Sequence, residues 1–559
     1  MDDAHESKGF DFTCNADINR LLNTVVDSVR DFTESQREQI RRLTRIGAAL
    51  SAERNIGRLL EMIVDEARQF TNADGGTLYI VSDDEKKLRF AIVQNESLKT
   101  RMGGTSGDIT WSPVNLYDES GNPNHANVSS HAALSGNVVN IPDVYHADRF
   151  NFEGTRTFDA ATGYRSQSML VVPMRNHEND IIGVLQLLNA RDRFTGTTIA
   201  FSPECQELTE SLASQAAVSL TNNRLIHDLE TLFEAFIKTI ATAIDEKSPY
   251  TGDHGRRVVE LTMMIAEAVN KAQEGPFCNV RLNDDQMNEL RIAAWLHDVG
   301  KVAVPEYVMD KSTKLDGLFD RIELLRTRFE LMKRDVEIAR LKKAIVTGDV
   351  STEEGGGAVD CDDELSRIQD DYEFIARANQ GGEFMSDESI ERIQSIACRT
   401  WSVDGNKMPL LDEEEIKNLS VRKGTLTDEE RRVINSHVTI THKMLSQLPF
   451  PKKLKRVPEY ASTHHECING SGYPWGLKGD EIPLQSRIMA VADIFEAITA
   501  PDRPYRTANT LSGALKILGF MVKDNHIDGD IVDLFVKEKV YLAYAEKELS
   551  PSQIDEVVI

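Results

Sequence analysis

The stretch His464-His465-Glu466-Cys467-Ile468-Asn469-Gly470-Ser471-Gly472-Tyr473-Pro474 is the most informative part of this sequence. Two adjacent histidines before a Gly-Tyr-Pro turn are an unusual arrangement for a purely structural segment. A second polar cluster, His297-Asp298-Val299-Gly300-Lys301, lies upstream. Imidazole and carboxylate groups are good ligands for Fe, Mn, Ni and Zn. The two stretches together indicate a metal site assembled from distant parts of the chain.

Three further residues of metal-ligating type lie on helical faces that would ordinarily be apolar. His254 precedes an apolar face, His437 lies in the helix begun by Thr427, and Asp493 is flanked by small side chains. A single histidine in such a place is more often a satisfied core residue than a ligand. Several in one chain favour a metal site, because an unpaired buried carboxylate is costly and a cation is its natural partner.

These residues, taken in order, resemble the signature of the HD-GYP family, a branch of the HD superfamily that hydrolyses cyclic di-GMP. The resemblance extends over residues 244–535 apart from one insertion. Its other matching segments are Gly300-Lys301, Thr425-Leu426-Thr427, Gly472-Tyr473-Pro474, Ile482-Pro483-Leu484, Arg487-Ile488, Ala492-Asp493 and Arg503-Pro504-Tyr505-Arg506.

The resemblance implies a centre of two divalent ions, Fe or Mn, with Asp298 as the bridging ligand. It assigns His254, His297, Asp298 and Asp493 to one ion, and Asp298, His437, His464 and His465 to the other. A third ion is not expected, because Tyr250 stands where trinuclear members carry a glutamate. Asn469 also departs from the aspartate usual in the family, but it keeps a turn-forming side chain.

The resemblance also implies roles in catalysis and in substrate binding. Asp298 and Lys301 are the expected catalytic residues, with Lys301 contacting the phosphate; a solvated loop lysine is the alternative. Tyr473 either contacts a guanine or braces its loop. The expected substrate contacts are Lys301, Gly472, Tyr473, Pro474, Arg487 and Arg503.

The implied reaction is hydrolysis of cyclic di-GMP to pGpG, and further to GMP, by water that the two ions activate. Another cyclic dinucleotide, such as cyclic GMP-AMP, is an alternative substrate, because a metal site recognises phosphate rather than bases. A catalytically silent docking protein that senses a nucleotide and binds a diguanylate cyclase is an alternative from another class, and an HD-superfamily nucleotidase is a third.

Residues 45–227 change to short β-branched and aliphatic runs among helices, which predicts an α+β domain. Strands are expected at 76–81, 88–93, 169–172 and 181–187. The stretch from Asn140 to Asn189 resembles GAF modules of cyclic-nucleotide phosphodiesterases. The chain departs from nucleotide-binding members at Ala190 and at Cys205-Gln206, so the resemblance implies the fold and leaves the ligand site unassigned.

Helical stripes surround these two domains. The helical spacing that starts at Ile18 fits either a bundle face or a dimer contact. The spacing that runs from Leu208 to Ile240 predicts a continuous connector helix that transmits a signal or merely packs. Between Asp298 and His437, stripes from Leu318 to Phe329 and from Leu365 to Ile375 predict an inserted helical hairpin beside the site. It could be a lid, a dimer contact, a docking arm or a solvated ornament.

Composition places limits on the protein class. A net charge of −26 argues against nucleic acid as a partner, and scattered cysteines without an apolar membrane run predict a cytoplasmic protein that does not enter a membrane. We expect a homodimer.

The expected fold class is multidomain α+β, with a GAF-like sensor before an all-α HD domain. The expected segments are an N-terminal helix (1–44), the sensor (45–227), a connector helix (228–245), the HD-GYP domain (246–545) with its insertion (316–421), and a tail (546–559).

Overall fold

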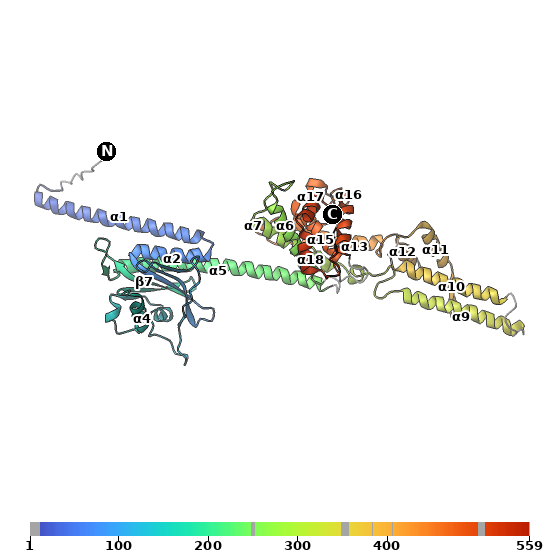
Figure 1. Cartoon of the computed structure of the whole chain (residues 1–559), viewed down its shortest axis with the longest axis horizontal. Coiled ribbons are helices and arrows are strands. Elements are labelled where there is room, and N and C mark those ends of the chain that lie inside the picture. The colour runs from blue at the N-terminus through green and yellow to red at the C-terminus, as the bar shows by residue number, and fades with distance from the viewer. Residues whose placement is uncertain are drawn as a thin grey trace. The chain divides into compact units, whose positions relative to one another are not determined.

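The computed structural model describes residues 12–247, 252–347, 357–382, 384–404, 406–500 and 509–557. The chain divides into two compact units, Met1–Leu232 and Phe233–Ile559 (Figure 1). The first is α+β and the second is almost entirely helical, which confirms the expected multidomain fold class. None of the helices in the described ranges combines the length and apolar character needed to cross a membrane.

The first unit is built on one antiparallel sheet whose main strand order is β3-β2-β1-β7-β6-β5, with β4 paired to β2 and β8 to β7. All four strands expected from the sequence are confirmed. The helices are α1 (Ala16–Ala52), α2 (Ile56–Thr71), α3 (Val128–Ser135), α4 (Glu153–Thr162) and α5 (Pro203–Asp245). The strands are β1 (Ala73–Val81), β2 (Lys87–Asn95), β3 (Thr100–Gly103), β4 (Val114–Asn115), β5 (Val139–Ile141), β6 (Met169–Arg175), β7 (Ile181–Arg191) and β8 (Thr198–Ile199).

Both faces of the sheet are covered because successive strand residues point to opposite sides. Leu78 of β1 and Leu170 of β6 belong to the core formed with α2 and α5. Their neighbours Tyr79 and Val171 belong to a second core that includes residues of α3. This alternation explains why the central strands consist of nearly continuous apolar runs.

The two long helices of the first unit extend beyond the segments expected from the sequence. α1 continues past residue 44 to Ala52, where Ile46 and Leu50 are buried, whereas Val25 and Phe32 near its start are exposed. α5 spans the whole helical spacing expected from Leu208 to Ile240, and it begins at Pro203, before the expected connector bound of residue 228. It contributes Leu212 to the core of the first unit and Ile237 to the core of the second.

The second unit packs its helices around one large apolar core. This core draws Ile265 from α6, Leu290 from α7, Phe495 from α15 and Phe535 from α17. The segment expected to be a tail also packs here, because Gln553 donates from Nε2 to the carbonyl oxygen of Thr499 at 2.8 Å. The helices of the second unit outside the insertion are α6 (His254–Lys271), α7 (Asp284–Leu296), the 3-10 turn η2 (Val299–Ala303), α8 (Glu306–Met309), α13 (Asp428–Leu445), α14 (Val457–Ser462), α15 (Leu484–Thr499), α16 (Leu511–Lys523), α17 (Gly529–Lys537) and α18 (Val540–Glu548).

The insertion is more than the expected hairpin. α9 (Ile322–Thr347) and α10 (Gly357–Asn379) lie side by side (Figure 1), and Phe329 packs edge-on against Tyr372 with ring centroids 5.6 Å apart. α11 (Asp387–Ala397) and α12 (Glu413–Leu419) complete a separate core with them, and Trp401 of β9 (Thr400–Val403) packs against it. β10 (Asn406–Pro409) pairs with β9. The expected stripe was wrong at one end, because Leu318 lies before α9 and is 97% exposed. We call this part (residues 315–419) the inserted subdomain.

Candidate metal centre

Five different segments of the second unit present the seven expected metal ligands. His254 is the first residue of α6, and His297 and Asp298 lie between α7 and η2. The remaining three segments are α13, which carries His437, the turn after α14, which carries His464 and His465, and α15, which carries Asp493. Five of the seven are classed as buried. The structure therefore brings residues 239 positions apart in the sequence, from 254 to 493, into one site.

The helical backbone orients three of the histidine rings in the same way. The Nδ1 atoms of His297 and His464 lie 2.7 and 2.8 Å from the carbonyl oxygens of Ala294 and Ala461, three residues earlier. His437 makes the equivalent contact with Ile434. A carbonyl oxygen can only accept, so Nδ1 carries the proton and Nε2 keeps the lone pair that binds a metal.

Asp298 lies at the middle of the cluster. Its Oδ2 is 3.2 Å from Nε2 of His297 and 3.6 Å from Nε2 of His254, while its Oδ1 is 3.3 Å from Nε2 of His437. Asp493 Oδ1 is 3.3 Å from Nε2 of His254. The two oxygens of Asp298 thus face different groups of histidines, which is the arrangement a bridging carboxylate requires.

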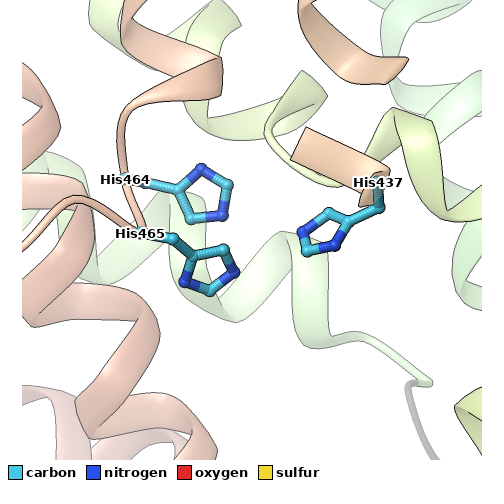
Figure 2. A group of neighbouring side chains, drawn as sticks. All are labelled: His437, His464 and His465. Carbon is cyan, nitrogen blue, oxygen red and sulfur yellow. The ribbon is translucent and has the colours of Figure 1, made fainter. Parts of the chain in front are cut away.

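The buried polar atoms of this site fit a bound cation. Nε2 of His297, His437 and His464 and Oδ1 of Asp298 are all buried without a hydrogen-bond partner in the described structure. Buried polar atoms are normally hydrogen-bonded, so four such atoms together call for another partner. The donor atoms form two sets, His254 with His297 and Asp298, and His437 with His464 and His465, each set lying within 4.8 Å. Figure 2 shows the second set, with the adjacent rings of His464 and His465 facing His437.

The protonation equilibria reflect burial and the charges in the cluster. Burial raises the pKa of Asp298, but the charges of Lys301 and His297 outweigh this and hold its pKa well below the usual range. Burial lowers the pKa of His465 to about 4, and it also holds the pKa of His464 well below its usual value. Before a metal binds, the two adjacent imidazoles are therefore neutral at pH 7, as ligands must be.

Close packing fixes η2 against α13. A Cβ on Gly300 would lie 1.9 Å from the carbonyl oxygen of His437, so no other residue fits there. The Gly300 N–H donates to Thr441 Oγ1 at 2.9 Å, and this hydroxyl donates to the carbonyl oxygen of His297 at 3.2 Å. Thr441 thereby links the His-Asp pair to the helix that carries His437.

A cleft of about 480 Å³ opens beside the ligands. Lys301 and Tyr473 line it together with five of the expected ligands, and the Lys301 ammonium donates to Asp298 Oδ2. The Tyr473 ring stacks on His465 with centroids 4.9 Å apart. The remaining wall is mostly apolar and consists of Ile434, Asn435, Ile494, Ala497, Ile498, Ile517 and Met521.

The Gly-Tyr-Pro loop is held by a buried carboxylate. Glu466 accepts hydrogen bonds from the backbone N–H groups of Trp475 and Leu477 at 2.7 and 2.9 Å. Asn469 accepts from the Ser471 N–H at 2.8 Å, which confirms its turn-forming role. These contacts fix the loop so that Tyr473 faces the cleft.

Three of the other expected substrate contacts, Gly472, Pro474 and Arg487, do not line this cleft. Arg487 donates to Asp528 Oδ2 at 2.7 Å and is not part of the wall, and Gly472 and Pro474 are also absent from it. Arg503, and Tyr250 at the position of the third-ion glutamate, lie outside the described residues.

Glu496, which lies one helical turn beyond Asp493, was not expected from the sequence to be part of the site. Its Oε2 contacts Nδ1 of His254, and its Oε1 accepts from Nε of Arg257 at 2.7 Å. Burial lowers the pKa of His254, but the Glu496 charge and the nearby aspartates raise it well above its usual value. The signal was present, because residues at i and i+3 share a helical face, but a glutamate there is equally typical of a solvated surface.

Comparison with protein families identifies the domains. The GAF domain matches residues 55–220, and two HD domain families match residues 251–345 and 413–531. The residues between the two HD matches lie within the inserted subdomain. The chain therefore contains a GAF domain followed by an HD domain that is interrupted by an insertion, and this confirms the domain families expected from the motifs.

Characterised relatives share parts of the chain. The 3′3′-cGAMP-specific phosphodiesterase 3 of Vibrio cholerae serotype O1 is 42% identical over 97 residues, which make up 17% of this chain and 20% of that protein. The cyclic di-GMP phosphodiesterase of Thermotoga maritima is 43% identical over 96 residues, 17% of this chain and 26% of that protein. A probable cyclic di-GMP phosphodiesterase of V. cholerae is 27% identical over 261 residues, 44% of this chain and 55% of that protein. The chain thus spans between 20% and 55% of the length of these relatives.

Proposed function

We propose that this GAF and HD domain protein is a metal-dependent phosphodiesterase that hydrolyses cyclic di-GMP to pGpG. The gathering of His254, His297 and His437 around Asp298, with four buried polar atoms of the site lacking hydrogen-bond partners among the described residues, is the observation that carries the proposal. A self-contained structural cluster would satisfy these atoms internally.

Two divalent ions, Fe or Mn, would supply charge neutralisation and lower the pKa of an attacking water. His254, His297, Asp298 and Asp493 would hold one ion, and Asp298, His437, His464 and His465 the other. The chain's own contribution is to orient these ligands through the backbone contacts of Nδ1 and to keep the site dry on its buried side.

Lys301 and Tyr473 are the proposed contacts for the substrate. The Lys301 ammonium lies at the cleft beside Asp298 and can reach a phosphate oxygen next to the ions. Tyr473 presents an aromatic ring at the same opening, and the apolar wall formed by residues such as Ile498 and Met521 suits a purine face. The cleft therefore combines a polar end for phosphate with an apolar end for a base.

A second candidate substrate is 3′3′-cGAMP. It is favoured by the similarity to a phosphodiesterase specific for this compound, which is as strong as the similarity to the cyclic di-GMP enzyme of T. maritima. Both compounds present the same phosphodiester groups, and on this proposal the one purine by which they differ would contact the apolar wall of the cleft. Regulation by the GAF domain and assembly as a homodimer are parts of the same proposal.

The test is to load the full chain with Mn(II) or Fe(II) without oxygen and to follow each cyclic dinucleotide by chromatography. We expect linear pGpG to accumulate, with a higher kcat/KM for cyclic di-GMP than for 3′3′-cGAMP. Lys301→Ala should keep its metal and lower kcat/KM about 10- to 100-fold. Lys453→Ala, which removes a surface pair with Asp285, is the matched control and should be unaffected. Absence of product from fully metallated protein would contradict the proposal.

A further inference from the structure

The C-terminal end of α5 contacts two of the segments that carry metal ligands. Lys247 follows this helix and points its ammonium at the turn η2. Its Nζ donates to the carbonyl oxygens of Lys301, Val302 and Val304, at 3.1 Å for Lys301 and 2.7 Å for Val302. A lysine ammonium has three protons, and here three backbone carbonyls receive them. These are the carbonyls at the C-terminal end of η2, where a cation is favourable.

The last residue of α5 makes the complementary contact at the start of α6. Asp253 precedes this helix with a left-handed backbone (φ 62°), and its side chain does not cap it. Asp245 takes this role from another element, because its Oδ2 accepts the backbone N–H of Gly255 at 3.1 Å. A carboxylate at a helix N-terminus satisfies a backbone donor and complements the helix dipole. The residue before Gly255 is the ligand His254.

We infer that Asp245 and Lys247 are positioning residues for the metal centre, through which the end of α5 sets the relative placement of His254 and Asp298. Asp245 caps the helix that begins with His254, and Lys247 caps the turn that follows Asp298 and contains Lys301. The inference rests on the proposed metal site and adds a means of regulating it. The end of α5 contacts both the start of α6, which carries His254, and the turn η2, which follows Asp298. A displacement of this end would therefore change the distance between His254 and Asp298. Because α5 also forms part of the first unit, such a displacement could originate there.

The close contacts around His254 and Gly255 mean that even a small displacement would alter the placement of the ligands. His254 Nε2 is 3.6 Å from Asp298 Oδ2, and both residues belong to the first set of donors. A Cβ on Gly255 would lie 3.0 Å from Asp245 Oδ2, so the cap fits closely. Metal affinity is sensitive to small changes in ligand placement, and losing a contact that orients a ligand typically costs about 10- to 100-fold in affinity or activity.

The test measures Mn(II) binding by the full-length protein, using electron paramagnetic resonance to count free and bound ions. Lys247→Met removes the three donors and keeps the apolar stem. We expect Mn(II) affinity to fall about 10-fold and kcat to fall with it, while KM for cyclic di-GMP changes little. Lys247→Arg, which retains several N–H donors, should restore most of the affinity.

Glu234→Gln is the matched control. Glu234 also lies on α5 and pairs with Arg291 of α7, and among the described residues its side chain makes no hydrogen bond or ion pair with η2 or with the start of α6. This variant should bind Mn(II) like the wild type. Asp245→Ala provides a second, independent perturbation and should weaken Mn(II) binding with an unchanged circular dichroism spectrum.

The outcomes separate the two proposals. Wild-type protein that binds Mn(II) and turns over substrate, together with Lys247→Met and Asp245→Ala variants of unchanged affinity, would overturn the positioning role alone. Equal losses in Glu234→Gln and Lys247→Met would also overturn it, because they would reflect general loosening of α5. Wild-type protein that binds no Mn(II) would overturn both proposals.

Discussion

Both units of this protein bury carboxylates, but the carboxylate at the centre of the candidate metal site differs from the buried aspartates of the first unit. In the first unit, Asp74 accepts from Ser97 at Oδ1 and from Tyr164 at Oδ2, and Asp159 accepts from Ser166 at Oδ1 and Tyr145 at Oδ2. In the second unit, Oδ1 of Asp298 has no hydrogen-bond partner among the described residues. Burial of polar groups therefore does not by itself mark a ligand site. What marks it is convergent, oriented atoms without partners.

Asp298→Ala removes the carboxylate whose Oδ1 has no hydrogen-bond partner among the described residues, and this change should have the largest effect. The variant loses the carboxylate that is proposed to bridge the two ions, so both ions should be lost and kcat should fall by at least about 10³-fold. Metal analysis of the purified protein and chromatography of the products measure the two effects. Full activity with one ion retained would contradict the bridging role.

Glu496→Gln changes a buried carboxylate that is fully paired, with the candidate ligand His254 and with Arg257. His254 loses the negative charge that holds its Nδ1–H, and Arg257 loses its ion pair. We expect Mn(II) affinity to fall about 10- to 100-fold, measured by titration.

The control for this prediction is Glu289→Gln. Glu289 is a buried glutamate of the same unit that accepts from the Arg456 N–H at 2.7 Å, away from the ligands. Equal affinity losses in the two variants would show that Glu496 acts through folding alone.

Asp159→Ala removes a buried carboxylate that is hydrogen-bonded at both oxygens. The change leaves the Tyr145 hydroxyl and the Ser166 N–H and hydroxyl without their acceptor in the first unit. We expect the free energy of unfolding of that unit to fall by about 2 kcal/mol, seen as a lower melting temperature in calorimetry. Metal content should be unchanged, and a loss of metal would break the comparison.

The sequence predicted the parts of the fold that periodicity and side-chain chemistry encode locally. The four long strands, the buried face behind His254 and the helix begun by Thr427 followed from runs of a few residues each. The metal ligands were expected from their resemblance to a family, and the structure brings all seven together.

The partners of these ligands could not be predicted in the same way. Lys247 acts through backbone carbonyls, which carry no sequence signal, and Glu496 reaches a residue 242 positions away. The number of elements in the inserted subdomain was underestimated. Its two long helices have a clear apolar periodicity in the sequence, whereas its short elements, such as β9 and α12, contribute only one or two core residues each. Long-range contacts of this kind depend on the tertiary arrangement rather than on local pattern.

Two neighbouring lysines at the base of the inserted subdomain offer the smallest and most discriminating test. Both are buried, but Lys311 pairs with Glu430 at 2.8 Å, whereas Lys314 donates to one carbonyl oxygen, that of Leu419, at 2.9 Å. Burial lowers the pKa of Lys314 to about 8, from an ordinary value of 10.5. The folded state therefore resists the charge on Lys314, while the ion pair of Lys311 compensates for its own.

Lys314→Met should stabilise the protein at pH 7 by about 1 kcal/mol, because it removes an incompletely compensated buried charge. Below pH 8 the lysine is charged in both folded and unfolded states, so this gain is constant. Between pH 8 and 10.5 the unfolded state binds more protons, wild-type stability from this group rises with pH, and the gain shrinks. Lys311→Met should instead destabilise at pH 7, since it leaves the Glu430 carboxylate without its partner. Melting temperatures of both variants from pH 7 to 10 measure the effect, and a Lys314→Met gain that does not change with pH would show that burial of its charge is not the cause.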